Sequence, residues 1–137
     1  MAEYQLSIER GSNYLHATVA GDNTPETVLR YMTEIRADCL RAGMFNVLIV
    51  VNLDGPGISM LEVYKVIAAT VDSAVGLGMQ VAYVDLNPLH SVANMLLGEN
   101  VAMTRGIPVR TFRAVSQATE WLLEQTAGDA TPQLQAL

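Results

Sequence analysis

Hydrophobic positions along the chain follow two different periods, and their alternation predicts the order of its secondary structure. Period-two or unbroken apolar runs favour strands, and apolar positions three or four residues apart favour helices. Strands are expected at 4–9, 14–20, 47–51, 80–85 and 109–112. Helices are expected at 25–42, at 59–75, from 87 to about 97 with further turns at 99–105 after an interruption at Gly98, and from 116 onward. The order ββαβαβαβα predicts an α/β fold, with a mixed sheet of about five strands packed by about four helices through right-handed crossovers.

The segment 46–75 is the centre of this predicted fold. Val47–Val51 is an unbroken apolar run, which suits an interior strand that is buried on both faces. Turn residues follow at 53–57, and Ser59 with Glu62 forms a capping box that opens a long apolar helix. A helix start that carries a hydroxyl directly after a strand can hold an anion or accept a phosphate. The residues of this candidate site are Asp54, Gly55, Gly57 and Ser59.

Three loops should meet at the edge of the sheet where ligands bind in such folds, namely 21–24, 54–59 and 85–90. Each begins with or contains an aspartate (Asp22, Asp54 and Asp85), and such carboxylates could hold Mg²⁺ or Ca²⁺, although aspartate is also an ordinary loop residue. His90 could meet Asp54 or Ser59 in the same crevice. A hydrolase is the least favoured interpretation, because no G-x-S-x-G elbow is present and the serine already serves as a cap.

The helix expected after Ser59 is apolar on more than one stripe, so it is either deeply buried or faces something besides its own sheet. A protein partner or a second copy of the chain would cover that surface. The chain also has 7 methionines, which fill a core or line an adaptable pocket. Residues that could line a small apolar pocket are Met60, Tyr64, Ile67, His90, Met95 and Leu96.

Composition narrows the possible functions. A chain of 137 residues with 50% hydrophobic content suits one domain, expected at 1–125, with a flexible tail at 126–137. The net charge of -6 leaves no basic stripe, so nucleic acid is not an expected partner. One cysteine, Cys39, and the lack of a long apolar run predict a cytoplasmic protein with no signal peptide and no membrane span. Neither a cofactor nor a metal is expected.

Two stretches resemble a known family. VLIVVNLDGPGIS at 47–59, and NVAMTRGIPVRTF at 100–112 followed by ATEWLL, are similar to the SpoIIAA-like group of the STAS and SEC14-like (CRAL-TRIO) superfamily. The resemblance spans about 4–123 and implies the SpoIIAA-like fold. In the anti-sigma factor antagonists of that group, a serine at the start of the second helix is phosphorylated by a partner kinase, and phosphorylation switches partner binding. Ser59 stands at that position, but Ile58 replaces the acidic residue that precedes the serine in the family.

The resemblance and the loop chemistry together favour a non-enzymatic, protein-binding regulatory module that acts through the loop 54–59 and the helix after it. The SEC14-like side of the superfamily binds lipids, so a protein that binds a small apolar ligand is the alternative. A small hydrolase comes third.

Overall fold

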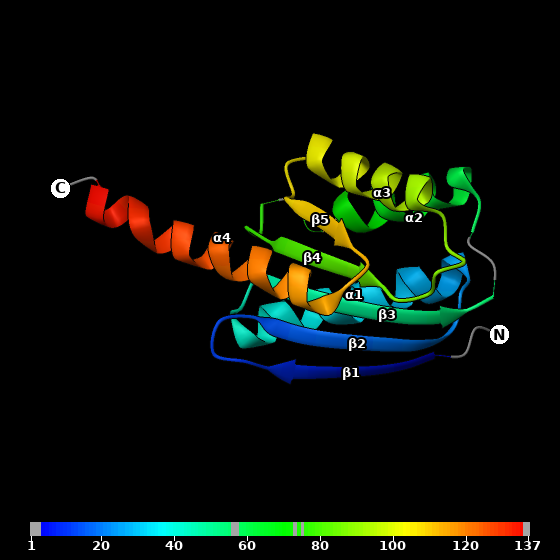
Figure 1. Cartoon of the computed structure of the whole chain (residues 1–137), viewed down its shortest axis with the longest axis horizontal. Coiled ribbons are helices and arrows are strands. Elements are labelled where there is room, and N and C mark those ends of the chain that lie inside the picture. The colour runs from blue at the N-terminus through cyan, green and yellow to red at the C-terminus, as the bar shows by residue number, and fades with distance from the viewer. Residues whose placement is uncertain (1–3, 56–57, 73, 75, 136–137) are drawn as a thin grey trace.

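A computed structural model of the chain describes residues 4–55, 58–72, 74 and 76–135. The strands are β1 (Tyr4–Arg10), β2 (Leu15–Asp22), β3 (Asn46–Asp54), β4 (Gln80–Asp85) and β5 (Val109–Phe112), and the helices are α1 (Pro25–Ala42), α2 (Met60–Asp72), α3 (Val92–Thr104) and α4 (Val115–Gln135) (Figure 1). The predicted order of elements and the α/β fold class are confirmed.

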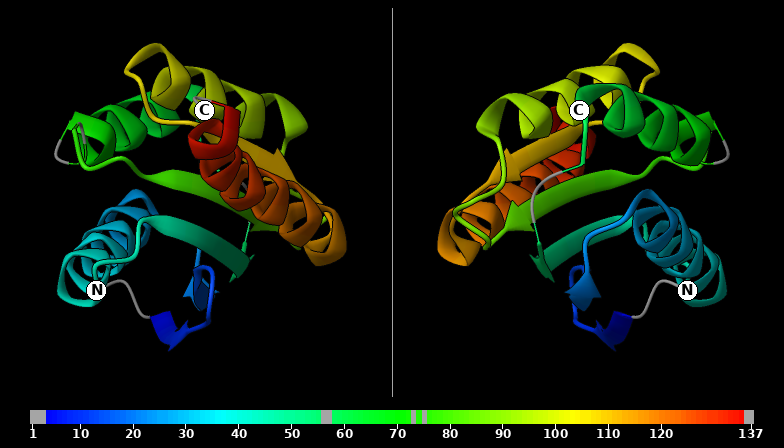
Figure 2. Two further views of the ribbon diagram at one scale, coloured as in Figure 1. Left: turned by 90° about the vertical axis from the view of Figure 1, so that its left-hand side faces the viewer. Right: turned by 90° about the vertical axis from the view of Figure 1, so that its right-hand side faces the viewer.

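The sheet has the strand order β1-β2-β3-β4-β5, with β1 antiparallel to β2 and the other neighbours parallel. From β2 onward, each crossover moves to the next strand in the same direction. Right-handed crossovers must therefore place α1, α2 and α3 on the same face of the sheet. Figure 2 shows these three helices on one side and α4 on the other. The valine-rich β3 lies in the middle of the sheet, as its composition predicts.

Side chains of β3 and β4 alternate between two apolar clusters. Val47, Ile49 and Val51 face the three-helix side, whereas Leu48 and Val50 face α4. All five are buried, which explains why the run shows no polar alternation in the sequence. The sheet therefore has a core on each face of its interior strands.

The first helix begins and ends as its sequence predicts. Thr24 is the N-cap of α1 and its side chain accepts a hydrogen bond from the Thr27 N–H, at 3.0 Å, and Pro25 is the first helical residue. Gly43 ends the helix in a left-handed conformation with φ of 67°, which glycine adopts without strain. Among its apolar side chains, Val28, Ile35 and Cys39 are buried, whereas Leu29 and Leu40 are exposed.

Two helix boundaries differ from the prediction. The helix α3 starts at Val92 with Ser91 as its N-cap, and not at Asn87, because residues 87–90 form a separate turn. It then continues through Gly98 to Thr104 without interruption. The helix α4 continues to Gln135, past the expected domain boundary at residue 125, and its end projects beyond the sheet (Figure 1). Flexibility of the segment 126–137 stays a prediction.

Candidate functional site

The start of α2 has the capping geometry that its sequence predicts. The Glu62 N–H donates to Ser59 Oγ at 3.2 Å, and the Ser59 N–H donates to Glu62 Oε1 at 3.1 Å. The Ser59 hydroxyl also donates to Glu62 Oε1, at 3.0 Å. Ser59 and Glu62 are both exposed, so the hydroxyl can be reached from solvent while it caps the helix.

The loop before Ser59 begins at the end of β3. Asp54 is its last residue and is exposed, and Gly55 follows with φ of 92°, a conformation that glycine tolerates. Gly57, the remaining residue of the predicted anion site, lies outside the described residues. Whether the loop 54–59 holds an anion or a phosphate stays a prediction.

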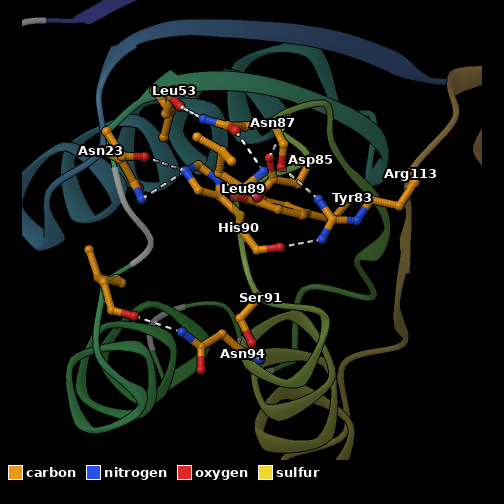
Figure 3. Close-up of polar contacts among 12 residues, drawn as sticks. Asn23, Leu53, Tyr83, Asp85, Asn87, Leu89, His90, Ser91, Asn94 and Arg113 are labelled. Carbon is orange, nitrogen blue, oxygen red and sulfur yellow. Dashed lines mark hydrogen bonds and ion pairs between the residues drawn. The ribbon is translucent and has the colours of Figure 1, made fainter.

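A buried histidine joins the three loops at the carboxyl edge of the sheet (Figure 3). His90 Nδ1 lies 2.7 Å from Asp85 Oδ2, and Nε2 lies 3.1 Å from the Gly55 carbonyl oxygen and 3.3 Å from Asn23 Nδ2. His90 is 7% exposed and Asp85 is 6% exposed. The histidine therefore connects the loops that follow β2, β3 and β4.

This contact pattern corrects the predicted pairing. His90 contacts the backbone of Gly55 and the carboxylate of Asp85, whereas the described hydrogen bonds of the Ser59 side chain are with Glu62. The expected pairing of His90 with Asp54 or Ser59 is thus replaced by a pair within one loop. Ser59 and His90 therefore belong to two separate features, an exposed helix cap and a buried histidine–aspartate pair.

The turn at residues 87–90 holds that histidine in place. The Asn87 N–H donates to Asp85 Oδ1 at 3.0 Å, its side-chain amide donates to the Leu53 carbonyl at 2.8 Å, and its Oδ1 accepts from the Leu89 N–H at 2.9 Å. Arg113 donates to the Asn87 carbonyl at 2.7 Å and also to the His90 carbonyl. Asn87 stabilises a turn in this way, which explains why α3 starts only at Val92, after its N-cap Ser91.

The start of α3 is tied directly to the residue before Ser59. The side-chain amide of Asn94 donates to the Ile58 carbonyl oxygen at 2.7 Å (Figure 3). Asn94 also lies in the first turn of α3, where its N–H donates to Ser91 Oγ at 3.3 Å. The entry to α2 therefore depends on two contacts from the segment after β4, through His90 and through Asn94.

A cavity of about 170 Å³ lies between α2 and the sheet. The reason is that α2 packs against α1 and α3, and within the described chain its backbone does not closely approach any strand. Side chains fill only part of the space beneath it. The walls are mostly apolar and come from every element of the three-helix side, including Val28, Met32, Val51, Val66, Ile67, Met79, Val81, Met95, Ala102 and Ile107.

The predicted pocket residues fall into two groups. Ile67, His90 and Met95 line this cavity. Met60, Tyr64 and Leu96 are not among the described residues that line it, and their exposed fractions are 55%, 45% and 46%. These three lie on outward-facing parts of α2 and α3. The sequence pattern could not separate the groups, because α2 is apolar on both its inner and its outer surface.

Polar side chains also reach the cavity, and several were missed by the sequence analysis. Tyr83 lies on its wall, and the Tyr83 and Tyr31 hydroxyls are 2.8 Å apart. Burial raises the pKa of both tyrosines, which stay neutral at physiological pH. Arg36 and Glu99 also line the cavity. The alternation of β4 points to Tyr83 as inward-facing, but no sequence signal separates Arg36 from the other arginines of α1.

Exposed apolar side chains gather beside Ser59. In α2 these are Met60, Leu61 and Tyr64, and Leu61 is 62% exposed. Around the start of α3 they are Leu89, Val92 and Leu96, and Leu89 is 80% exposed. We call these residues the outer apolar surface. Exposed large apolar side chains that form a patch are typical of a surface that contacts another molecule.

Neither a metal cluster nor a membrane-spanning helix is found among the residues that the structure describes. Asp22, Asp54 and Asp85 are the last residues of neighbouring parallel strands, but no group of three His, Cys, Asp or Glu side chains in the described ranges is close enough to hold a metal ion. Asp85 is instead engaged by His90 and Asn87. No helix within those ranges is sufficiently long and apolar to cross a bilayer.

Solved structures of similar architecture identify the fold. An anti-sigma factor antagonist from Mycobacterium paratuberculosis superposes with a TM-score of 0.57 at 12% identity, covering 88% of this chain and 94% of that one. The chain has the SpoIIAA-like, or STAS, fold. A serine-to-glutamate variant of RsbS from Moorella thermoacetica gives 0.56 at 14% identity, covering 90% and 98%. The protein TM1081 gives 0.53 at 18% identity, covering 84% and 86%.

The likeness is one of fold and not of close sequence. No protein-family profile and no curated protein sequence matches the chain. The resemblance to SpoIIAA-like proteins that the sequence indicates is confirmed at the level of architecture. In this STAS fold, Ser59 lies at the start of α2, immediately after the loop that leaves the central strand.

Proposed function

We propose that this STAS-fold chain is a protein-binding regulatory module that acts without catalysis, as an antagonist of an anti-sigma factor. Its binding surface is the loop 54–59 together with the outer apolar surface. The observation that carries the proposal is the position of Ser59, an exposed helix cap flanked by exposed Met60, Leu61 and Tyr64. The likeness to an anti-sigma factor antagonist supports the choice of partner.

Phosphorylation of Ser59 is the regulatory step in this proposal. A phosphate there is a dianion near neutral pH. It would replace the hydroxyl that donates to Glu62 Oε1, at 3.0 Å, and would therefore bring two like charges together. The backbone N–H groups at the start of α2 favour the phosphate, but the carboxylate opposes it. A partner that binds the apolar residues beside an uncharged serine would be released by this change.

The test uses binding of the anti-sigma factors from the same genome, measured by isothermal titration calorimetry. Ser59→Glu should weaken binding at least about tenfold, whereas Ser59→Ala should retain it. Ser116→Glu is the matched control, because Ser116 is an exposed serine in the first turn of α4. Equal effects of Glu at residues 59 and 116, or full binding by Ser59→Glu, would contradict the proposal.

Self-association is tested in the same preparations. A second copy of the chain could cover the outer apolar surface, and sedimentation velocity would then show a dimer that Leu61→Glu dissociates. A cytoplasmic location fits either partner, because the cysteine of the chain, Cys39, is a buried free thiol.

A second candidate function, binding of a small apolar ligand, is favoured by the cavity beneath α2. Its volume of about 170 Å³ is close to that of an engineered cavity of about 150 Å³ that binds benzene. Native mass spectrometry of gently purified protein would detect a carried ligand. The cavity and the proposed protein-binding surface are adjacent, because Ile58 lines the cavity and directly precedes Ser59. One chain could therefore have both functions.

A further inference from the structure

The cavity beneath α2 has mostly apolar walls and a few charged side chains, and their arrangement limits the class of ligand that it can bind. We propose that it binds a small monocarboxylate whose compact apolar body fills the space under α2 and whose carboxylate pairs with Arg36. This inference rests on the second candidate function, ligand binding, and adds the class of ligand and a residue that recognises it.

The size of the cavity limits the apolar body of the ligand. A space of about 170 Å³ accommodates an aromatic ring or a chain of about six to eight carbon atoms. It is too small for the two acyl chains of a membrane lipid. The walls are apolar, and two flexible methionines, Met79 and Met95, can adjust to the shape of the occupant. A single short chain or a single ring is therefore the expected body.

The charged side chains on the cavity wall determine which polar group the ligand should carry. Arg36 lines the cavity from α1, is half-buried, and makes neither an ion pair nor a hydrogen bond with any residue in the described part of the chain. Four other arginines make ion pairs with Asp or Glu, and Arg113 donates to backbone carbonyls. An unpaired guanidinium at an apolar cavity is a ready partner for a carboxylate.

The two carboxylates on the wall are already engaged. Asp85 contacts His90 through one oxygen and accepts from the Asn87 N–H through the other. Glu99 Oε1 accepts from the Thr111 N–H at 2.8 Å and from its hydroxyl at 3.3 Å. These acids come from β4 and α3, whereas Arg36 comes from α1, which packs beside β1 and β2. Repulsion from the acids therefore directs a ligand carboxylate toward α1.

Binding of benzoate and hexanoate, measured by protein NMR titration, tests this proposal. Benzamide and 1-hexanol are the neutral probes of similar size. We expect the two acids to bind at least about tenfold more tightly than their neutral counterparts, which is the typical effect of a hydrogen-bonded charge. Arg36→Gln should remove that preference and leave binding of the neutral probes unchanged. Arg30→Gln, on the same helix but outside the cavity, should behave as wild type.

A cavity-filling variant separates failure of the ligand class from failure of the site. Ala102 is 1% exposed and lines the cavity, so Ala102→Met should weaken binding of all four probes. If this variant does not fold, shifts of the Val66 and Ile67 methyl signals in the wild type locate the bound probe instead. Equal affinity for the acids and the neutral probes would contradict the proposal that the ligand is a monocarboxylate, but not the proposal that the cavity is a binding site. No binding of any probe would overturn the site itself.

Discussion

The two faces of the sheet are packed in different ways, although the same strands supply both. On one face, Leu48, Val50 and Val84 pack directly against Ala118 and Leu122 of α4. On the other face, α2 packs on α1 and α3 and leaves a partly open cavity of about 170 Å³ against the sheet. The face with a single helix is therefore the more tightly packed one.

The difference teaches where stability and function lie in this fold. Dense packing against α4 stabilises the central strands, because removing a buried side-chain contact lowers the free energy of unfolding of the protein. The three-helix face is less densely packed, and it contains a partly open cavity with an exposed helix start beside it. Ser59, the outer apolar surface and Arg36 all belong to that less dense side. The predictions below test this division, beginning with the largest expected effect.

Matched truncations on the two faces give the most direct test. Leu122→Ala should lower the free energy of unfolding by about 4 kcal/mol, because the side chain is fully buried against β3 and β4. Ile67→Ala should lower it by about 2 kcal/mol, because Ile67 borders an existing cavity and has fewer contacts to lose. Urea denaturation monitored by circular dichroism measures both. Equal losses would show that the faces are packed equally well.

The buried pair at the carboxyl edge should give the next largest effect. Asp85→Asn keeps the shape of the side chain but removes the charge beside His90 Nδ1, at 2.7 Å, and should cost about 2 kcal/mol. Asp54→Asn is the matched control. Asp54 is the last residue of the neighbouring strand β3 and is exposed, so we expect a change below about 0.5 kcal/mol. If the two variants lose the same stability, the pair does not hold the loops together.

The sequence predicts much of this molecule because local patterns determine its elements. The β-branched run at 47–51, the cap at Thr24 and the capping box at Ser59 each depend on residues close in sequence, and each has the predicted conformation. The site could be predicted only in part. His90 pairs with Asp85 because Asn87 forms a turn that bonds to Leu53, a contact between segments far apart in sequence. Likewise, the space beneath α2 results from how three helices pack together.

The cap of α2 should contribute less than either buried site. Ser59→Ala removes the acceptor for the Glu62 N–H and should lower stability by about 1 kcal/mol. Ser59→Asp restores an acceptor at the same position and should recover most of this loss. Thermal unfolding measures the difference. A loss well above about 2 kcal/mol would mean that the start of α2 contributes more to the stability of the protein than a solvent-exposed helix cap does.

The smallest effect is expected from Cys39, whose thiol packs in the core of the three-helix face away from solvent. Burial raises the pKa of this thiol from 9.0 to about 11. The neutral thiol is favoured in the folded state, so its full contribution is present below pH 9 and is lost as the pH rises from 9 toward 11. At pH 9.5 the loss should be less than about 1 kcal/mol. Cys39→Ala should make the fall of unfolding free energy between pH 8.5 and 9.5 less steep, and the part that remains is expected from Tyr31 and Tyr83, whose pKa is also raised by burial from 10.0. An equally steep fall in this variant would mean that the interior around α1 admits water, and that the loose packing of this face is not confined to the space beneath α2.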